Sequence, residues 1–162
     1  VRFHVNMKEI AGFRIAGSGR FEAGQVEAEN LELKIDGSGR MDLEQVKAQA
    51  VQTRVGGSGK VSITRLEADS IDTEISGSGK IVLAGQVQKQ SLEIGGSGNY
   101  LAEGLQSEAA QVRIGGSGNA ELAVSGSLEV TISGSGKVAY SGQPRVSESV
   151  SGSARIVSLS EN

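Results

Sequence analysis

The stretch Ile35-Asp36-Gly37-Ser38-Gly39-Arg40-Met41 decides the fold, because its central Gly-Ser-Gly returns along the whole chain. Successive copies are separated by 20, 20, 20, 19, 20, 18 and 18 residues. A nearly constant period of this length is typical of a protein built from stacked structural repeats. The copies lie at residues 17–19, 37–39, 57–59, 77–79, 96–98, 116–118 and 134–136, and a degenerate eighth copy is Gly152-Ser153-Ala154.

Apolar and polar side chains alternate between the copies of Gly-Ser-Gly, as they do along β-strands. Steps of two residues keep side chains on one face of a strand, and a step of three places one extra residue at a bend. No stretch of the sequence shows sustained helical spacing. Each repeat is therefore predicted to hold three short strands, two bends and one Gly-Ser-Gly corner. In the third repeat, the predicted inward positions are Val61, Ile63, Leu66, Ala68, Ile71, Thr73 and Ile75.

A single repeat of this kind cannot bury its apolar face, whereas stacked repeats cover one another. The sequence therefore predicts an all-β fold, a single-stranded parallel β-helix of about eight rungs of 18–20 residues. Rungs stacked about 4.8 Å apart would place Val61 over Ile81, and Ile35, Val55 and Ile75 in one column. Because crossovers between parallel strands are usually right-handed, we expect right-handed winding.

The chain of 162 residues is expected to form one β-helix domain, 1–162, which is the C-terminal part of a longer exported protein. Residues 1–5 already alternate like a rung, so we expect a preceding region or a neighbouring chain to cover their edge. A signal sequence is expected upstream of this chain. Residues 155–159 are predicted to form a last partial rung, and residues 160–162 a polar tail.

The composition excludes several classes of protein. The net charge is −3 and charges of both signs are interspersed, so attraction to nucleic acid is not expected. No run of 18 apolar residues is present that could form a transmembrane helix. Cysteine is absent, which excludes disulfides, thiolate nucleophiles and cysteine-ligated metal ions.

None of the glycine-containing motifs matches a catalytic or ligand-binding signature. Gly57-Ser58-Gly59-Lys60 lacks both the earlier Gly and the following Ser or Thr of a phosphate-binding loop. The single histidine, His4, is expected at the surface. The nearby carboxylates Asp69, Asp72 and Glu74 are explained as solvated side chains of strands and turns. We therefore predict no catalytic residue, no cofactor and no metal ion.

A basic side chain follows most of the Gly-Ser-Gly corners. Stacked rungs would align these positions in a basic stripe, interrupted by two Asn: Arg20, Arg40, Lys60, Lys80, Asn99, Asn119, Lys137 and Arg155. Neighbouring cations in such a stripe repel by only about 1 kcal/mol in water, and Glu22 and Asp42 are placed to reduce this further. One interpretation is a solvated edge that discourages aggregation. The other is a weak binding track for an anionic glycan, carried by Arg20, Arg40, Lys60, Lys80, Lys137 and Arg155.

The corner pattern resembles a known bacterial family, the putative auto-transporter adhesin, head GIN domain. Residues 35–41 and 75–81 carry the resemblance, each with a hydrophobic residue, a variable residue, Gly-Ser-Gly, a polar residue and a hydrophobic residue. The likeness extends from about residue 10 to residue 159. It implies a β-helical domain exported to the periplasm, the outer membrane or the cell surface, and it brings no catalytic or ligand-binding residues. Lys or Arg after the corner departs from the family pattern.

Three functional hypotheses follow. The first is a non-enzymatic exported β-helical domain, an adhesin or a structural and binding module of the cell envelope, whose partners are surface glycans or envelope components. The second is a carbohydrate-active enzyme that degrades polysaccharides, which would need clustered carboxylates in a groove. The third is a scaffold that forms homo-oligomers through the exposed edges of its end rungs.

Overall fold

The computed structural model describes residues 3–6 and 10–159, with side-chain burial from residue 12 onward. Over these residues the chain forms strands and no helix. The described residues therefore contain no helix that is long and apolar enough to cross a membrane. The predicted polar tail, residues 160–162, lies outside the described residues. The strands are β1 (Phe3–Asn6), β2 (Ile10–Gly17), β3 (Arg20–Gly37), β4 (Arg40–Gly57), β5 (Lys60–Ile75), β6 (Lys80–Ile94), β7 (Asn99–Ile114), β8 (Asn119–Gly134), β9 (Lys137–Ser141), β10 (Arg145–Gly152) and β11 (Arg155–Ser158).

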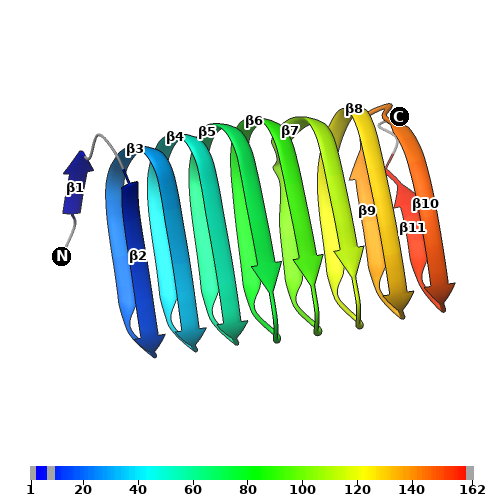
Figure 1. Cartoon of the computed structure of the whole chain (residues 1–162), viewed down its shortest axis with the longest axis horizontal. Helices are drawn as coiled ribbons and strands as arrows, with labels where there is room; N and C mark the ends of the chain where they lie inside the picture. The colour runs from blue at the N-terminus through cyan, green and yellow to red at the C-terminus, as the bar shows by residue number, and fades with distance from the viewer. Residues whose placement is uncertain (1–2, 7–9, 160–162) are drawn as a thin grey trace.

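Parallel pairing between successive repeats builds a β-solenoid whose rungs stack along the long axis of the molecule (Figure 1). From β3 to β8, each strand is hydrogen-bonded to the rung before it and to the rung after it. The predicted all-β parallel solenoid is thus confirmed. The eight rungs expected from the sequence correspond to about seven turns, because the first and last rungs are partial. Right-handed winding stays a prediction from the usual chirality of parallel crossovers.

Each central rung is one long bent strand rather than the three short strands that the sequence predicts. β3 and β4 each run for 18 residues, and β5 runs for 16. Pairing continues through the bends because the neighbouring rung bends at the same place, so the backbone amides keep their partners. The register between β5 and β6 shifts between Ile63 and Leu66, where the two rungs differ in length.

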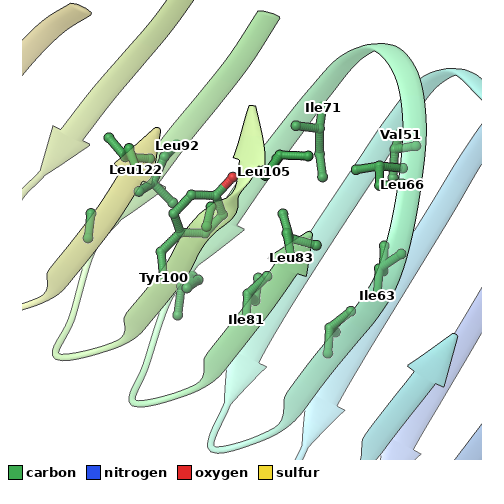
Figure 2. Close-up of a cluster of buried hydrophobic side chains, with 14 of the residues drawn as sticks. Val51, Ile63, Leu66, Ile71, Ile81, Leu83, Leu92, Tyr100, Leu105 and Leu122 are labelled. Carbon is green, nitrogen blue, oxygen red and sulfur yellow. The ribbon is translucent and has the colours of Figure 1, made fainter. Parts of the chain in front are cut away.

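The core consists of aliphatic columns that run along the solenoid, as the sequence predicts. Val61 pairs with Ile81, and Ile35, Val55 and Ile75 form one column of directly stacked residues. All five side chains are at most 1% exposed. Figure 2 shows such side chains of successive rungs pointing into a shared interior. Full burial of a large aliphatic side chain stabilises the fold by about 1.5–3 kcal/mol, so the columns hold the rungs together.

From the second corner to the seventh, the Gly-Ser-Gly corners stack so closely that a Cβ does not fit at either flanking glycine. The amide of Ser38 donates to the carbonyl of Gly17, one rung earlier, at 2.9 Å, and the later corners repeat this bond. A Cβ on Gly37 would lie 2.5 Å from the same Gly17 oxygen, and the φ angle of Gly37 is +131°. Both the close approach and the positive φ require glycine. The corner serines are exposed, so the stacked corners align them in a row at the surface.

A short polar chain crosses the largely aliphatic interior, which also contains Thr53 and Thr73. The Tyr100 hydroxyl donates to Gln90 Oε1 at 2.9 Å, and Gln90 Nε2 donates to Ser107 Oγ at 2.6 Å. Ser107 Oγ in turn donates to the carbonyl of Ala123 at 3.0 Å. The three side chains are at most 3% exposed, and burial raises the pKa of the Tyr100 phenol. These polar groups are tolerated in the core because they satisfy one another.

Candidate binding surfaces

The residues that follow the corners form one ladder along the length of the solenoid. All of their side chains are exposed or half-exposed. The structure therefore places the basic stripe where stacking predicts it, and its binding of a glycan stays a prediction. Parallel pairing joins successive members in the order Arg20, Arg40, Lys60, Lys80, Asn99, Asn119, Lys137 and Arg155.

Acidic side chains of the adjacent column neutralise the first two cations of the basic stripe. The Arg20 guanidinium lies 2.6 Å from a carboxylate oxygen of Glu22 and 3.4 Å from one of Asp42. Arg40 Nε donates to Asp42 Oδ2 at 2.7 Å, and this hydrogen bond raises the pKa of the guanidinium. Because these pairs are exposed to solvent, they contribute little to stability. Their main effect is to reduce the positive charge of the first rungs.

The central cations, Lys60 and Lys80, have different neighbours. The adjacent column, which is acidic in the two preceding rungs, continues here with Ser62 and Val82. Within the part of the chain that the structure describes, no salt bridge involves Lys60 or Lys80. Unlike Arg20 and Arg40, these two ammonium groups are therefore not held by a carboxylate in a salt bridge within the described residues.

A pair of carboxyl groups borders the later part of the basic stripe. The hydrogen bond between Glu121 and Glu103 raises the pKa of Glu121, and partial burial and the charge of Glu103 act in the same direction. The positive charges of Lys137 and Lys80 oppose this shift. The pair therefore places acidic groups beside the cations of these rungs.

Two shallow grooves follow the second bend of the rungs, which in β5 lies between Ala68 and Ile71. The first groove has a volume of about 560 Å³ and runs over the columns of Glu67, Ala68 and Asp69. The second groove, of about 680 Å³, runs over the columns of Ser70 and Asp72. A smaller hollow of about 120 Å³ lies further along the same side, beside Arg54.

The carboxylates that lie close in the sequence are distributed over this side of the solenoid. Asp69 lines the first groove, and Asp72 lies between the second groove and the small hollow, which it lines together with Glu74. Glu74 pairs there with Arg54 at 3.3 Å between Nε and a carboxylate oxygen. Among the described residues, no group of three or more His, Asp or Glu side chains could hold a metal ion. The side chain of His4 lies outside the part that is described.

The first groove was not among the predicted sites, although its signal is present in the sequence. The same triplet of polar, small and polar residues recurs in successive rungs as Glu67-Ala68-Asp69, Gln86-Val87-Gln88 and Gln106-Ser107-Glu108. Alternation alone marks the polar members as outward-facing. It does not show that two rows of them flank a depression, which depends on the bend and on the half-buried Ala68 between them.

Comparison with known proteins agrees with the repeat and the fold. The profile of the family described as "putative auto-transporter adhesin, head GIN domain" matches residues 1–64 and 44–144. No curated protein matches the chain.

Three solved structures are similar to this solenoid. A "putative adhesin" from Parabacteroides distasonis is 25% identical with a TM-score of 0.90, over 92% of this chain and 64% of that protein. A "putative lipid binding protein" from the same organism is 26% identical with a TM-score of 0.74, over 95% of this chain and 61% of that protein. A "putative adhesin" from Parabacteroides merdae is 16% identical with a TM-score of 0.70, over 94% of this chain and 90% of that protein. At this identity, the likeness shows the fold alone. This chain therefore spans less than two thirds of the first two proteins.

Proposed function

The chain belongs to the putative auto-transporter adhesin, head GIN domain family, and on that premise we propose that it is a non-enzymatic binding module of the cell envelope. The module is exported to the periplasm, the outer membrane or the cell surface, where it serves adhesion or envelope structure. Its basic stripe contacts acidic groups of surface glycans, with Lys60 and Lys80 at the centre of the contact and Arg40 beside them.

The observation that supports this proposal most directly is a pair of lysines, without salt bridges among the described residues, at paired positions of adjacent rungs. Lys60 and Lys80 are direct partners across β5 and β6, and such rungs lie about 4.8 Å apart. A row of cations at this spacing suits a linear polymer with repeated acidic groups. Each exposed contact is weak and screened by salt, so the affinity has to come from several contacts made at once.

The two asparagines of the stripe extend the same row with groups that recognise hydroxyls. Asn119 Nδ2 donates to Asn99 Oδ1 at 3.1 Å, so this bond uses neither the NH2 group of Asn99 nor the acceptor oxygen of Asn119. A sugar polymer presents hydroxyls beside its acidic groups. The order of Lys80, Asn99 and Asn119 along the stripe therefore suits an acidic glycan better than a simple row of charges would.

Charge reversal on the stripe tests the proposal. The variant carries Arg40→Glu, Lys60→Glu and Lys80→Glu, and its matched control carries Lys89→Glu, Arg113→Glu and Arg145→Glu, which change the net charge equally but lie off the stripe. Binding to dextran sulfate and polygalacturonate is measured by calorimetry, with uncharged dextran as the reference. We expect at least tenfold weaker binding for the stripe variant and a small change for the control.

Three results would contradict this reading of the stripe. Equal losses in both variants would show non-specific attraction by net charge, and unchanged binding in the stripe variant would remove the stripe as the site. Binding that appears only with vesicles containing anionic phospholipid would instead favour acidic lipid head groups, the chemistry suggested by the relative named as a lipid binding protein.

The absence of catalysis is tested separately. The ion pair between Glu74 and Arg54 supports it, because glycoside hydrolysis requires two available carboxyl groups on either side of one bond and Glu74 is one of the carboxylates that share the small hollow with Asp72. We expect no new reducing ends and no unsaturated products when the protein is incubated with acidic and neutral polysaccharides. A time-dependent release of either product would favour a polysaccharide-degrading enzyme instead.

Export is tested by fractionating cells that produce the full-length protein. We expect an antibody against this chain to detect it in the periplasmic, outer-membrane or surface fraction. Recovery in the cytosol alone would contradict the proposed location.

A further inference from the structure

We propose that the first groove binds a linear, uncharged saccharide chain, a ligand different from the acidic polymer assigned to the basic stripe. The groove crosses successive rungs near their second bend, so its length follows the solenoid axis. It is open to solvent and has a volume of about 560 Å³, which suits a short stretch of an extended polymer.

Amide and carboxylate side chains form the two walls of this groove. In one wall, Glu67, Gln86 and Gln106 are stacked through the parallel pairing of β5, β6 and β7. In the other, Gln88 Nε2 donates to Asp69 Oδ1 at 3.5 Å. Each glutamine presents a donor and an acceptor in one planar group. Sugar hydroxyls also donate and accept, so they can bond to both walls at once.

Small side chains form the floor between the walls. Ala48, Ala68, Val87 and Ser107 are direct partners in successive rungs. Ala48 and Ala68 are half-buried and leave room for a ring to approach with its C–H face. At the Ser107 end, the floor is fixed from beneath by the buried polar chain, and Ser125 Oγ donates to the Ser107 carbonyl at 3.2 Å. The binding surface is therefore preformed rather than mobile.

The charge of the groove opposes the ligand of the basic stripe. Glu67, Asp69 and Glu108 line the groove, and no cation is among its lining residues. The ammonium of Lys47 lies 3.7 Å from Glu67 and compensates only that carboxylate. An acidic polymer would be repelled here, whereas an uncharged one would pay no such cost. The stripe and the first groove are therefore expected to select different ligands.

A peptide strand is a less suitable occupant of the first groove. Peptides that add to a sheet need an open strand edge, where backbone amides are free. The groove lies over β5, β6 and β7, and each of these strands is already paired on both sides. A ligand in it is recognised by side chains alone, repeated once per rung, which favours a polymer with regularly repeated hydroxyls.

The experiment uses a titration with neutral linear hexasaccharides that differ in sugar and linkage, followed in ¹H–¹⁵N spectra. The glutamine side-chain amides give signals of their own in these spectra. We expect shifts at Gln86, Gln88 and Gln106, and about tenfold weaker binding in the variant Gln86→Ala/Gln106→Ala. The matched control is Gln52→Ala/Gln111→Ala, whose amides lie outside the groove and whose binding should remain within a factor of two.

The outcomes separate this inference from the proposed function of the basic stripe. Binding that survives charge reversal of the stripe but is lost in Gln86→Ala/Gln106→Ala supports it. No binding of any hexasaccharide at millimolar concentration overturns it, as does equal binding in the groove variant and its control. Shifts of the same amides by oligolysine, with none from the sugars, would assign the groove to a cationic peptide. None of these results alters the test made with acidic polymers.

Discussion

The Gly-Ser-Gly corner and the bends both turn the chain, yet they respond differently to changes in rung length. At the corners, the hydrogen bond from the serine amide to a glycine carbonyl of the preceding rung repeats at 2.9–3.0 Å. At the bends, the register shifts, as between Val82 and Ala84 in β6 and between Ala102 and Gln106 in β7. Rung lengths that vary from 18 to 20 residues are therefore absorbed at the bends while the corners stay aligned.

This difference has a simple physical origin. The corner packs backbone against backbone, and only hydrogen atoms fit where a Cβ would otherwise stand. The bend packs side chains against side chains, so a longer or shorter rung can be accommodated by local repacking. Most of the register shifts lie at the first bend, whereas both grooves lie at the second bend, where β7 and β8 change register between Ser107 and Ala109.

A one-residue insertion should give the largest difference in stability between a corner and a bend. We expect a serine inserted between Ser78 and Gly79 to abolish cooperative folding, because it breaks the glycine stack and turns the following inward side chains outward. The same insertion between Asp69 and Ser70, at the second bend, should lower Tm by only a few degrees. Thermal unfolding followed by circular dichroism measures both. Similar losses in the two proteins would mean that corner and bend are equally constrained.

Within one corner, alanine substitutions test the close packing directly. A Cβ on Gly98 would lie 2.5 Å from Ile75 Cγ2 and 3.1 Å from the Gly79 oxygen, whereas a Cβ on Gly95 would meet nothing within 4 Å. We expect Gly98→Ala to lower the free energy of unfolding by about 2–3 kcal/mol. Gly95→Ala should leave it unchanged or raise it by about 0.5 kcal/mol. Urea unfolding compares them, and equal values would count against the stacking argument.

The polar chain beneath the second bend predicts an intermediate effect. Gln90→Leu removes the acceptor of the Tyr100 hydroxyl and the donor to Ser107, so the free energy of unfolding should fall by about 1–3 kcal/mol. Adding Tyr100→Phe removes the Tyr100 hydroxyl, which Gln90→Leu leaves without an acceptor, and should recover part of the lost unfolding free energy. A double-mutant cycle in urea measures the coupling. Strictly additive losses would show that the two side chains do not act together.

The smallest effect is expected in alkaline solution. Burial raises the pKa of Tyr100 above its ordinary value of about 10. The folded protein therefore holds the phenol proton more tightly than the unfolded chain does. The contribution of this difference to the free energy of unfolding is complete below about pH 10 and is lost as the pH rises above it. We expect Tyr100→Phe to flatten the fall in unfolding free energy between about pH 9 and about pH 11. An unchanged slope would mean that Tyr100 is not the group responsible.

Much of the fold could be predicted because its determinants are local and repeated. The period of the corners places Ile35, Val55 and Ile75 in one column, and alternation marks them as buried. The continuity of the strands through the bends could not be predicted from a single repeat, because it depends on adjacent rungs bending together. The partial exposure of Ala68 has the same origin.

The candidate surfaces were predictable to different degrees. The basic stripe follows from the period alone, since Lys60 and Lys80 are one repeat apart. The ion pairs join residues of one rung, direct partners or diagonal neighbours, as between Arg14 and Asp36, 22 residues apart, and the choice among these depends on side-chain rotamers. The first groove depends on the relative heights of neighbouring side chains at a bend, a property of the assembled stack that no single repeat contains.

Direct stacking of the corners also makes the length of the protein proportional to its number of repeats. One additional unit of about 20 residues would lengthen the rod by a single step of about 4.8 Å and would touch only the two units beside it. Reach can therefore change through duplication or loss of units during evolution, without redesign of the remainder. A side chain that occurs once per unit is then repeated at even intervals along that length.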